Sequence, residues 1–223
     1  MPTLSTNEDN QGFRLYRKIM PNEFIIAFGD CSQGGEDANF VVFMSKTYSD
    51  IPLVFQKQGV AAEATPFIRE ALNWIHGKTK VKPIVALERN NGGSSEMSNL
   101  ITYNEGHYRI YYMKGEDGKP NGEKPGWDTT GGVNGTGTRP KMLGDWLMAY
   151  ESKAIRIYDE IIQEQHQTFI VNKNGKPEAA PNTHDDAVMA CAGAWQLFKT
   201  ENVVTKIHRR TEAKRLKMHV GGR

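Results

Sequence analysis

Two short apolar runs that each end in a carboxylate constrain this chain more than any other feature. The run 24–29 ends at Asp30, and the run 84–87 ends at Glu88. Short, continuous apolar runs bounded by turn residues are typical of buried strands. Because the ends of neighbouring strands meet at one edge of a sheet, we expect Asp30 and Glu88 to lie close together.

A third acidic motif stands near the other end of the chain. His184 is followed by Asp185 and Asp186, and the small, apolar residues 187–195 come next. This pattern predicts a helix whose small side chains allow a close approach to a sheet. Helix capping explains one aspartate there well and the adjacent one less well. For His184 three roles stay open, namely orienting a carboxylate, relaying a proton or lying exposed in a loop.

Carboxylates that converge in this way need a compensating charge, because like charges repel. Oxygen ligands favour Mg²⁺ or Mn²⁺ over Zn²⁺, and two such ions drive in-line displacement at phosphorus. Paired carboxylates also serve glycosidases, but three or four acids in basic surroundings fit phosphate chemistry better. The residues therefore predict a metal-dependent nuclease, with these metal ligands and catalytic residues: Asp30, Glu88, Asp185 and Asp186.

Composition narrows the class of protein further. The 223 residues suffice for one sizeable domain, but a formal charge of +2 is too small to predict a nucleic-acid partner. Cys31 and Cys191 lack zinc spacing, and no Cys/His/Asn signature supports Cys31 as a nucleophile. We expect a reduced, cytosolic protein that is neither secreted nor membrane-bound, since no stretch approaches the length of a membrane span.

The order of the predicted elements defines the fold class. We predict three strands, then helix, strand, helix, strand and mostly helices, with a Gly-rich functional or mobile loop at 113–139. Thr65 and Pro66 predict the start of the first helix, and Gly77 predicts its end. The result is an α/β fold with a mixed sheet flanked by helices, similar to the plan of ribonuclease H-like (integrase- and resolvase-like) proteins. The predicted strands are 24–29, 40–44, 53–58, 82–87, 108–113, 154–157 and 168–171, and the predicted helices are 64–76, 94–103, 140–150, 159–165 and 185–199.

Four motifs resemble those of one family, the C-terminal nuclease domain of tailed-bacteriophage large terminases. They appear in the family's order over residues 23–199, and together they are quite specific. The block around Trp127 and Arg139 separates terminases from other ribonuclease H-like enzymes. The motifs are Gly29–Asp30 with Gly34–Asp37, Glu88–Gly92, Gly126–Thr130 followed by Thr138–Pro140, and His184–Ala190.

The resemblance implies a two-metal endonuclease that cuts concatemeric viral double-stranded DNA during genome packaging, with little sequence specificity. Asp30 and Glu88 match the first two ligands of Mg²⁺ or Mn²⁺, and Asp186 matches the third with Asp185 beside it. The segment 113–139 matches the place where terminases carry a hairpin near the active site. The implied partners, in the host-cell cytoplasm, are double-stranded DNA, a terminase ATPase domain, the small terminase subunit and the portal protein.

The same reading divides the chain into three parts. It implies an inter-domain linker or leader at residues 1–20, a nuclease domain at 21–200 and a basic tail at 201–223. From residue 206 onward, seven Lys and Arg stand against one acid, so this run either contacts phosphates or is a solvated C-terminus.

The chain departs from complete large terminases in one respect, and other functions of the same fold stay open. Gly77–Thr79 resembles the end of a phosphate-binding loop, but Leu72 stands where its first glycine belongs, so the chain carries no ATPase motif. Arg89, Arg139 and Lys141 are predicted as possible DNA contacts at the rim of the site. A junction resolvase or transposase of the same fold, and a non-catalytic module that docks on a portal or DNA, stay open as alternatives.

Overall fold

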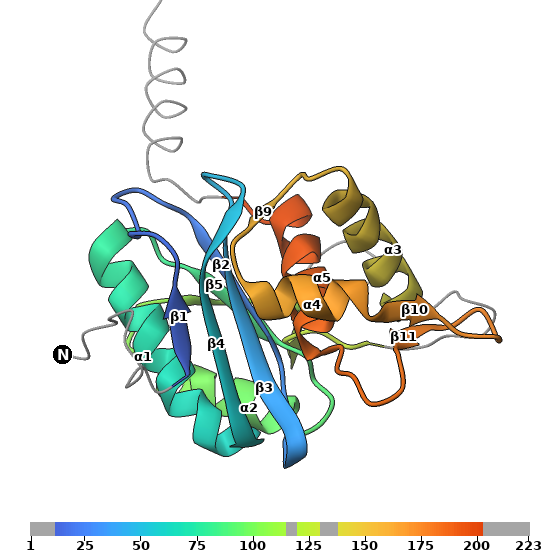
Figure 1. The fold of residues 1–223 in the computed structure, drawn as a ribbon. Helices are drawn as coiled ribbons and strands as arrows, with labels where there is room; N and C mark the ends of the chain where they lie inside the picture. Colours follow the sequence, from blue (N-terminus) through green and yellow to red (C-terminus); the bar gives the residue numbers. More distant parts are fainter. Residues whose placement is uncertain (1–11, 115–119, 130–137, 203–223) are drawn as a thin grey trace, which may run out of the picture.

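A mixed seven-stranded sheet forms the centre of the computed structural model, which describes residues 12–114, 120–129 and 138–202 (Figure 1). Its strands are β1 (Phe13–Leu15), β2 (Ile25–Asp30), β3 (Gln33–Ser45), β4 (Asp50–Val60), β5 (Ile84–Leu87), β6 (Arg109–Ile110) and β9 (Arg156–Ile157). The order is β1-β4-β3-β2-β5-β6, with β9 beside β4. Strands β2, β3 and β4 form an antiparallel meander, whereas β5 runs parallel to β2 and β6 runs parallel to β5. The predicted mixed α/β sheet is therefore confirmed.

Helices cover both faces of this sheet (Figure 1). One face carries α1 (Ala61–Thr79) and α2 (Gly93–Thr102), and the other carries α3 (Thr138–Glu151), α4 (Glu160–Gln167) and α5 (Asp186–Thr200). Residues of β2 alternate between the two cores: Ile25 packs with α1, whereas Ile26 and Phe28 pack with α5. Because both faces are buried, β2 appears in the sequence as a continuous apolar run.

Helix α5 lies unusually close to β2. A Cβ atom on Gly193 would stand 2.2 Å from the ring of Phe28, so only glycine fits at this point of the helix. The small residues that follow Asp186 allow this approach, as the sequence predicted. The contact fixes α5 over the strand that ends in Asp30.

The first helix does not have the limits that the sequence predicted. It begins at Ala61, immediately after β4, and Pro66 lies inside it rather than at its start. The hydroxyl of Thr65 donates to the carbonyl of Ala61 at 3.1 Å, so this residue does not act as the N-cap. Gly77 also lies inside the helix, which ends at Lys80 in a left-handed conformation with φ 61°. The sequence signals were wrong here because β4 leads directly into the helix without a turn.

Residues 12–20 belong to the folded domain, so the prediction of a linker up to residue 20 was wrong for this part. Strand β1 pairs with β4, and Phe13 is buried against Phe55. Arg14 and Tyr16 both donate to Asp159 at 2.7 Å, and Asp159 in turn caps α4 by accepting from the N–H of Ile162. A short edge strand among polar residues has too weak an apolar pattern to be recognised from sequence. Residues 1–11 and the basic run 206–223 lie outside the described residues.

Two short hairpins stand beside the main sheet. Strands β7 (Tyr112–Lys114) and β8 (Pro120–Pro125) pair within the Gly-rich segment, and β10 (Phe169–Val171) pairs with β11 (Pro177–Ala179) ahead of α5. The first hairpin lies where the resemblance placed one, and the pairing strand β11 was not predicted. No helix in the described ranges is long and apolar enough to cross a membrane.

Candidate metal centre

Asp30 and Glu88 stand side by side at the carboxyl ends of two neighbouring parallel strands. Gly29 pairs with Leu87 across β2 and β5, and the N–H of Glu88 donates to the carbonyl of Gly29 at 2.8 Å. A Cβ atom on Gly29 would stand 2.7 Å from the side chain of Leu87, so glycine leaves room for the Leu87 side chain beside the end of β2. The predicted meeting of these two carboxylates therefore follows from the sheet register.

The turn after Glu88 holds this residue in place. Glu88 is only 6% exposed, and Asn90 donates to its Oε1 at 3.0 Å. A Cβ atom on Gly93 would overlap the carbonyl oxygen of Glu88, so the chain needs glycine where it folds back into α2. Asn90 also donates to Thr129 Oγ1 at 3.0 Å, which ties the turn to the Gly-rich segment.

Trp127 extends the sheet edge next to Glu88. Its N–H donates to the carbonyl of Leu87 at 2.9 Å, and its carbonyl accepts from the N–H of Arg89 at 2.8 Å. Asp128, the next residue, forms an ion pair with Arg89 at 2.6 Å. The Gly-rich segment is thus joined at Trp127 to the backbone on both sides of Glu88.

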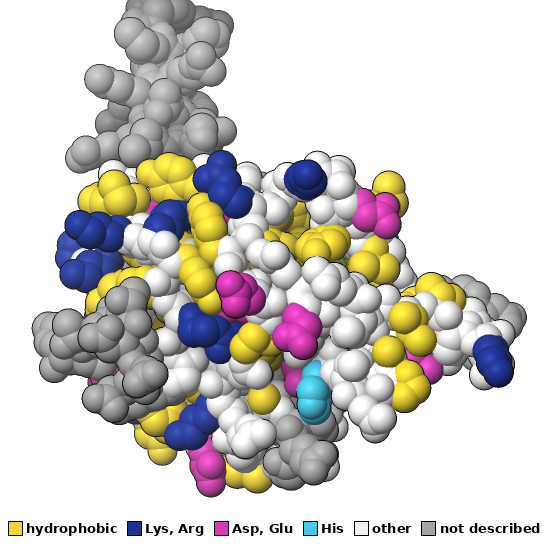
Figure 2. All heavy atoms as spheres, in the orientation of Figure 1, with side chains coloured by type: hydrophobic (Ala, Val, Ile, Leu, Met, Phe, Trp, Pro, Cys, Tyr) yellow, Lys and Arg dark blue, Asp and Glu magenta, His cyan; other side chains and the backbone are white. Residues whose placement is uncertain are grey.

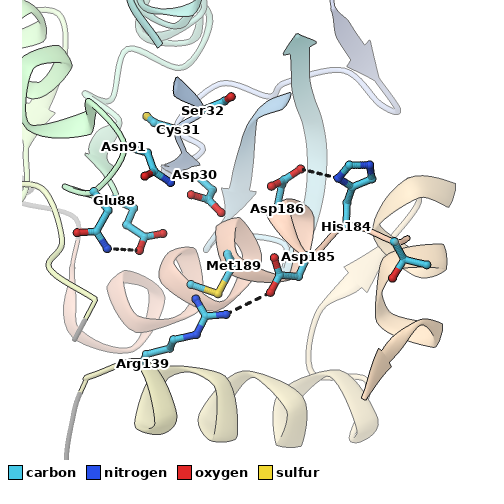
Figure 3. A pocket seen from close by; sticks show the side chains of 12 residues that line it. Asp30, Cys31, Ser32, Glu88, Asn91, Arg139, His184, Asp185, Asp186 and Met189 are labelled. Carbon is cyan, nitrogen blue, oxygen red and sulfur yellow. Dashed lines mark hydrogen bonds and ion pairs between the residues drawn. The ribbon is translucent and has the colours of Figure 1, made fainter. Parts of the chain in front are cut away.

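The acidic pair of α5 approaches the same place from the other side of the sheet. Asp185 is the N-cap residue and forms an ion pair with Arg139 of α3 at 3.1 Å. Asp186 begins the helix, and its Oδ2 lies 4.0 Å from Nδ1 of His184. Figure 3 shows both aspartates facing the space that Asp30 borders.

One cavity of about 570 Å³ unites these side chains (Figure 3). All four predicted acids line it, together with His184 and Arg139. The sequence assigned no site role to the other lining residues, although Asn90 and Asn91 belong to the Glu88–Gly92 motif and Cys31 was tested and rejected as a nucleophile. These further residues are Cys31, Ser32, Asn90, Asn91, Thr183 and Met189.

Burial and like charge perturb the carboxyl pair. The pKa of Asp30 is raised well above its ordinary value. The largest cause is burial, followed by the charge of Glu88 and then by the charges of Asp186 and Asp185. Burial also raises the pKa of Glu88, although its hydrogen bond with Asp30 and the charge of Arg139 oppose the rise. Burial and the neighbouring carboxylates therefore favour the protonated form of Asp30 when no cation compensates the charge.

The donor set fits a hard divalent cation, because such an ion relieves the repulsion that the proton relieves here. As the side chains stand, the described residues hold no group of three or more His, Cys, Asp or Glu close enough to share one ion. Asp185 forms its ion pair with Arg139 in this arrangement. Burial and the neighbouring carboxylates raise the pKa of the Cys31 thiol, which disfavours the thiolate form that a nucleophile needs.

The three predicted DNA contacts lie in different places. Among the described residues, Arg139 lines the cavity, whereas Arg89 pairs with Asp128 beside it. Lys141 pairs with Asp145 on the surface of α3. In Figure 2, acidic side chains and a histidine gather near the middle of the face drawn, and Lys and Arg side chains are scattered around them.

The sheet order, with acids at the ends of β2 and β5 and at the start of α5, defines a ribonuclease H-like fold. The same fold occurs in solved large terminase nucleases. That of thermophilic phage G20c with bound magnesium has a TM-score of 0.58 and 11% identity, with 83% of this chain and 87% of that chain covered. The nuclease domain of Thermus phage P74-26 gives 0.57 and 11%, with 87% and 90% covered, and that of P22 gives 0.50 and 12%, with 83% and 86% covered.

This chain therefore has the fold of large terminase nuclease domains, as its motifs predicted. The G20c nuclease has also been solved with bound cobalt and with bound zinc. No family model matches the chain, and no curated protein matches it in sequence.

Proposed function

We propose that this protein is a divalent-metal-dependent DNA endonuclease that cleaves concatemeric viral double-stranded DNA during genome packaging. The observation that carries the proposal is the convergence of Asp30, Glu88, Asp185 and Asp186 on one cavity within the fold of terminase nucleases. Paired sugar-cleaving carboxylates do not account for the four acids or for the arginine among them.

The proposed cation site uses all four acids. Asp30 lies between Glu88 and the aspartates of α5, so it is the ligand best placed to serve two positions. Oxygen donors favour Mg²⁺ or Mn²⁺. Two such ions supply a polarised water for attack at phosphorus and stabilise the charge on the leaving oxygen.

The remaining residues of the cavity orient these ligands and meet the substrate. Asn90 holds the Glu88 carboxylate by its 3.0 Å hydrogen bond, and His184 stands beside Asp186. The guanidinium of Arg139 lines the cavity, where it contacts a substrate phosphate once divalent ions neutralise the acids. Contacts of this kind read the backbone rather than the bases, which gives low sequence specificity and strong salt dependence.

The proposal extends to the surroundings of the reaction. We place the chain in the packaging complex in the host-cell cytoplasm, with a terminase ATPase domain, the small terminase subunit and the portal protein as partners. The chain's likeness in fold to the nucleases of phages G20c, P74-26 and P22 supports this placement.

The first test is plasmid cleavage. Wild-type protein is incubated with supercoiled plasmid and Mg²⁺ or Mn²⁺, beside Asp30→Asn and an EDTA control. Asp145→Asn is the matched control, since this acid pairs with Lys141 and Lys199 and does not line the cavity. We expect nicking and linearisation by wild type and Asp145→Asn only. A folded wild-type protein that cuts with neither metal would favour a docking module, and a preference for branched DNA would favour a resolvase.

A further inference from the structure

A side chain of α4 caps the start of helix α5, and the side chain of the N-cap residue Asp185 does not. An aspartate at the N-cap ordinarily accepts a hydrogen bond from the second or third N–H of its helix. Asp185 occupies the N-cap, but its side chain accepts no such bond from the described N–H groups of α5. Instead, Oε1 of Gln165 in α4 accepts from the N–H of Ala187 at 2.7 Å. Ala187 is the second residue of the helix, so Gln165 takes an N–H that an N-cap aspartate would take.

We propose that Gln165 is a positioning residue that keeps Asp185 out of the capping role and so makes its carboxylate available to a divalent cation. The inference rests on the proposed function, which gives Asp185 a cation to bind. The N–H of Ala187 is satisfied whichever side chain accepts from it. With Gln165 as the acceptor, the Asp185 carboxylate lines the cavity and meets Arg139 at 3.1 Å.

The rest of α4 holds Gln165 firmly in this position. Gln165 is 7% exposed, and the start of α4 is capped by Asp159. The neighbouring His166 accepts from the indole N–H of Trp146 at 2.6 Å. Gln165 also borders a second cavity of about 290 Å³ next to Asp186. The Gln165 side chain thus fixes the start of α5 through its bond to Ala187, and partners behind metal ligands typically change metal affinity by about 10- to 100-fold.

Two substitutions of similar size separate this role from simple packing. Gln165→Leu removes the acceptor, whereas Gln165→Glu keeps an oxygen at the same reach. In Mn²⁺ titrations by calorimetry we expect Gln165→Leu to weaken binding about tenfold or more, and Gln165→Glu to bind like wild type. Plasmid nicking by Gln165→Leu should need correspondingly more Mn²⁺ and recover at saturating metal. Equal behaviour of the two variants overturns the inference.

A metal-free measurement decides the structural step independently. Urea midpoints in EDTA are compared for wild type, Gln165→Leu, Asp185→Ala and the double variant. We expect a non-additive result in which Asp185→Ala lowers the midpoint more in the Gln165→Leu background, because Asp185 then caps α5. Additive shifts refute the exchange of caps even if the protein is a nuclease. A wild type that binds no Mn²⁺ refutes the nuclease instead, and the cycle still reports on the cap.

Discussion

The close packing of α5 on β2 makes Gly193→Ala a direct test of how the site is positioned. The new Cβ would stand 2.2 Å from ring atoms of Phe28, whereas unstrained carbon atoms approach to about 3.5 Å. The ring is fully buried between the sheet and the helix, so α5 has to move away by roughly 1 Å. Overpacking of this kind costs about 1–3 kcal/mol, which lowers the Tm of a domain of this size by about 2–12 °C.

The same displacement carries Asp185 and Asp186 away from Asp30. A misplacement of about 1 Å typically costs on the order of 100-fold in rate, so the variant should lose plasmid nicking well below its Tm. Gly144→Ala in α3 is the matched control, because its Cβ meets no described atom within 4 Å. Replacing this exposed helical glycine should stabilise the protein by about 1 kcal/mol and leave nicking unchanged.

Thermal unfolding by circular dichroism in EDTA, together with nicking at 25 °C, measures both effects. An unchanged Tm for Gly193→Ala would refute the close contact between α5 and β2. A lowered Tm with wild-type nicking would show that the position of α5 does not set the geometry of the acids.

Three further results are expected from the perturbed groups. Because the pKa of Asp30 is raised, the metal-free protein binds a proton that the unfolded chain releases, so its stability falls as pH rises above about 4; Asp30→Asn should flatten this slope in urea titrations in EDTA. Burial lowers the pKa of His166, so stability is lost as pH falls below the unfolded value of about 6.5; urea midpoints between pH 7.5 and 5.5 should show a drop that His166→Gln removes. Mn²⁺ at about 100 times its Kd should stabilise the wild type by about 2.7 kcal/mol in thermal unfolding, and Asp30→Asn should abolish the gain.

Much of the fold and the position of the four acids could be predicted from sequence. Strands β2 and β5 are buried on both faces, so their apolar runs are continuous and their last residues are easily located. Parallel pairing of these strands then brings Asp30 beside Glu88 by register alone. The small residues of α5 indicated close packing, which Gly193 makes against Phe28.

Features that depend on tertiary contacts could not be predicted in this way. Strand β1 is stabilised by β4 and by Asp159 rather than by its own pattern. Helix α1 starts at Ala61 because β4 ends at the preceding residue, although Thr65–Pro66 is the stronger local signal for a helix start. The hydrogen bond from the N–H of Ala187 to Gln165 joins residues far apart in the sequence, so no local pattern around Asp185 predicts it.

The hydrogen bonds that Arg14 and Tyr16 donate to Asp159 determine where a shortened fragment of this domain can begin. Asp159 is fully buried and satisfied by Arg14, Tyr16 and the N–H of Ile162. A fragment that starts at residue 21 loses both side-chain donors and leaves a buried charge beneath α4, which costs about 3–5 kcal/mol. If such a fragment were inactive, the cause would be the loss of β1 and not the lack of a catalytic residue. A fragment of this domain must therefore begin before Phe13.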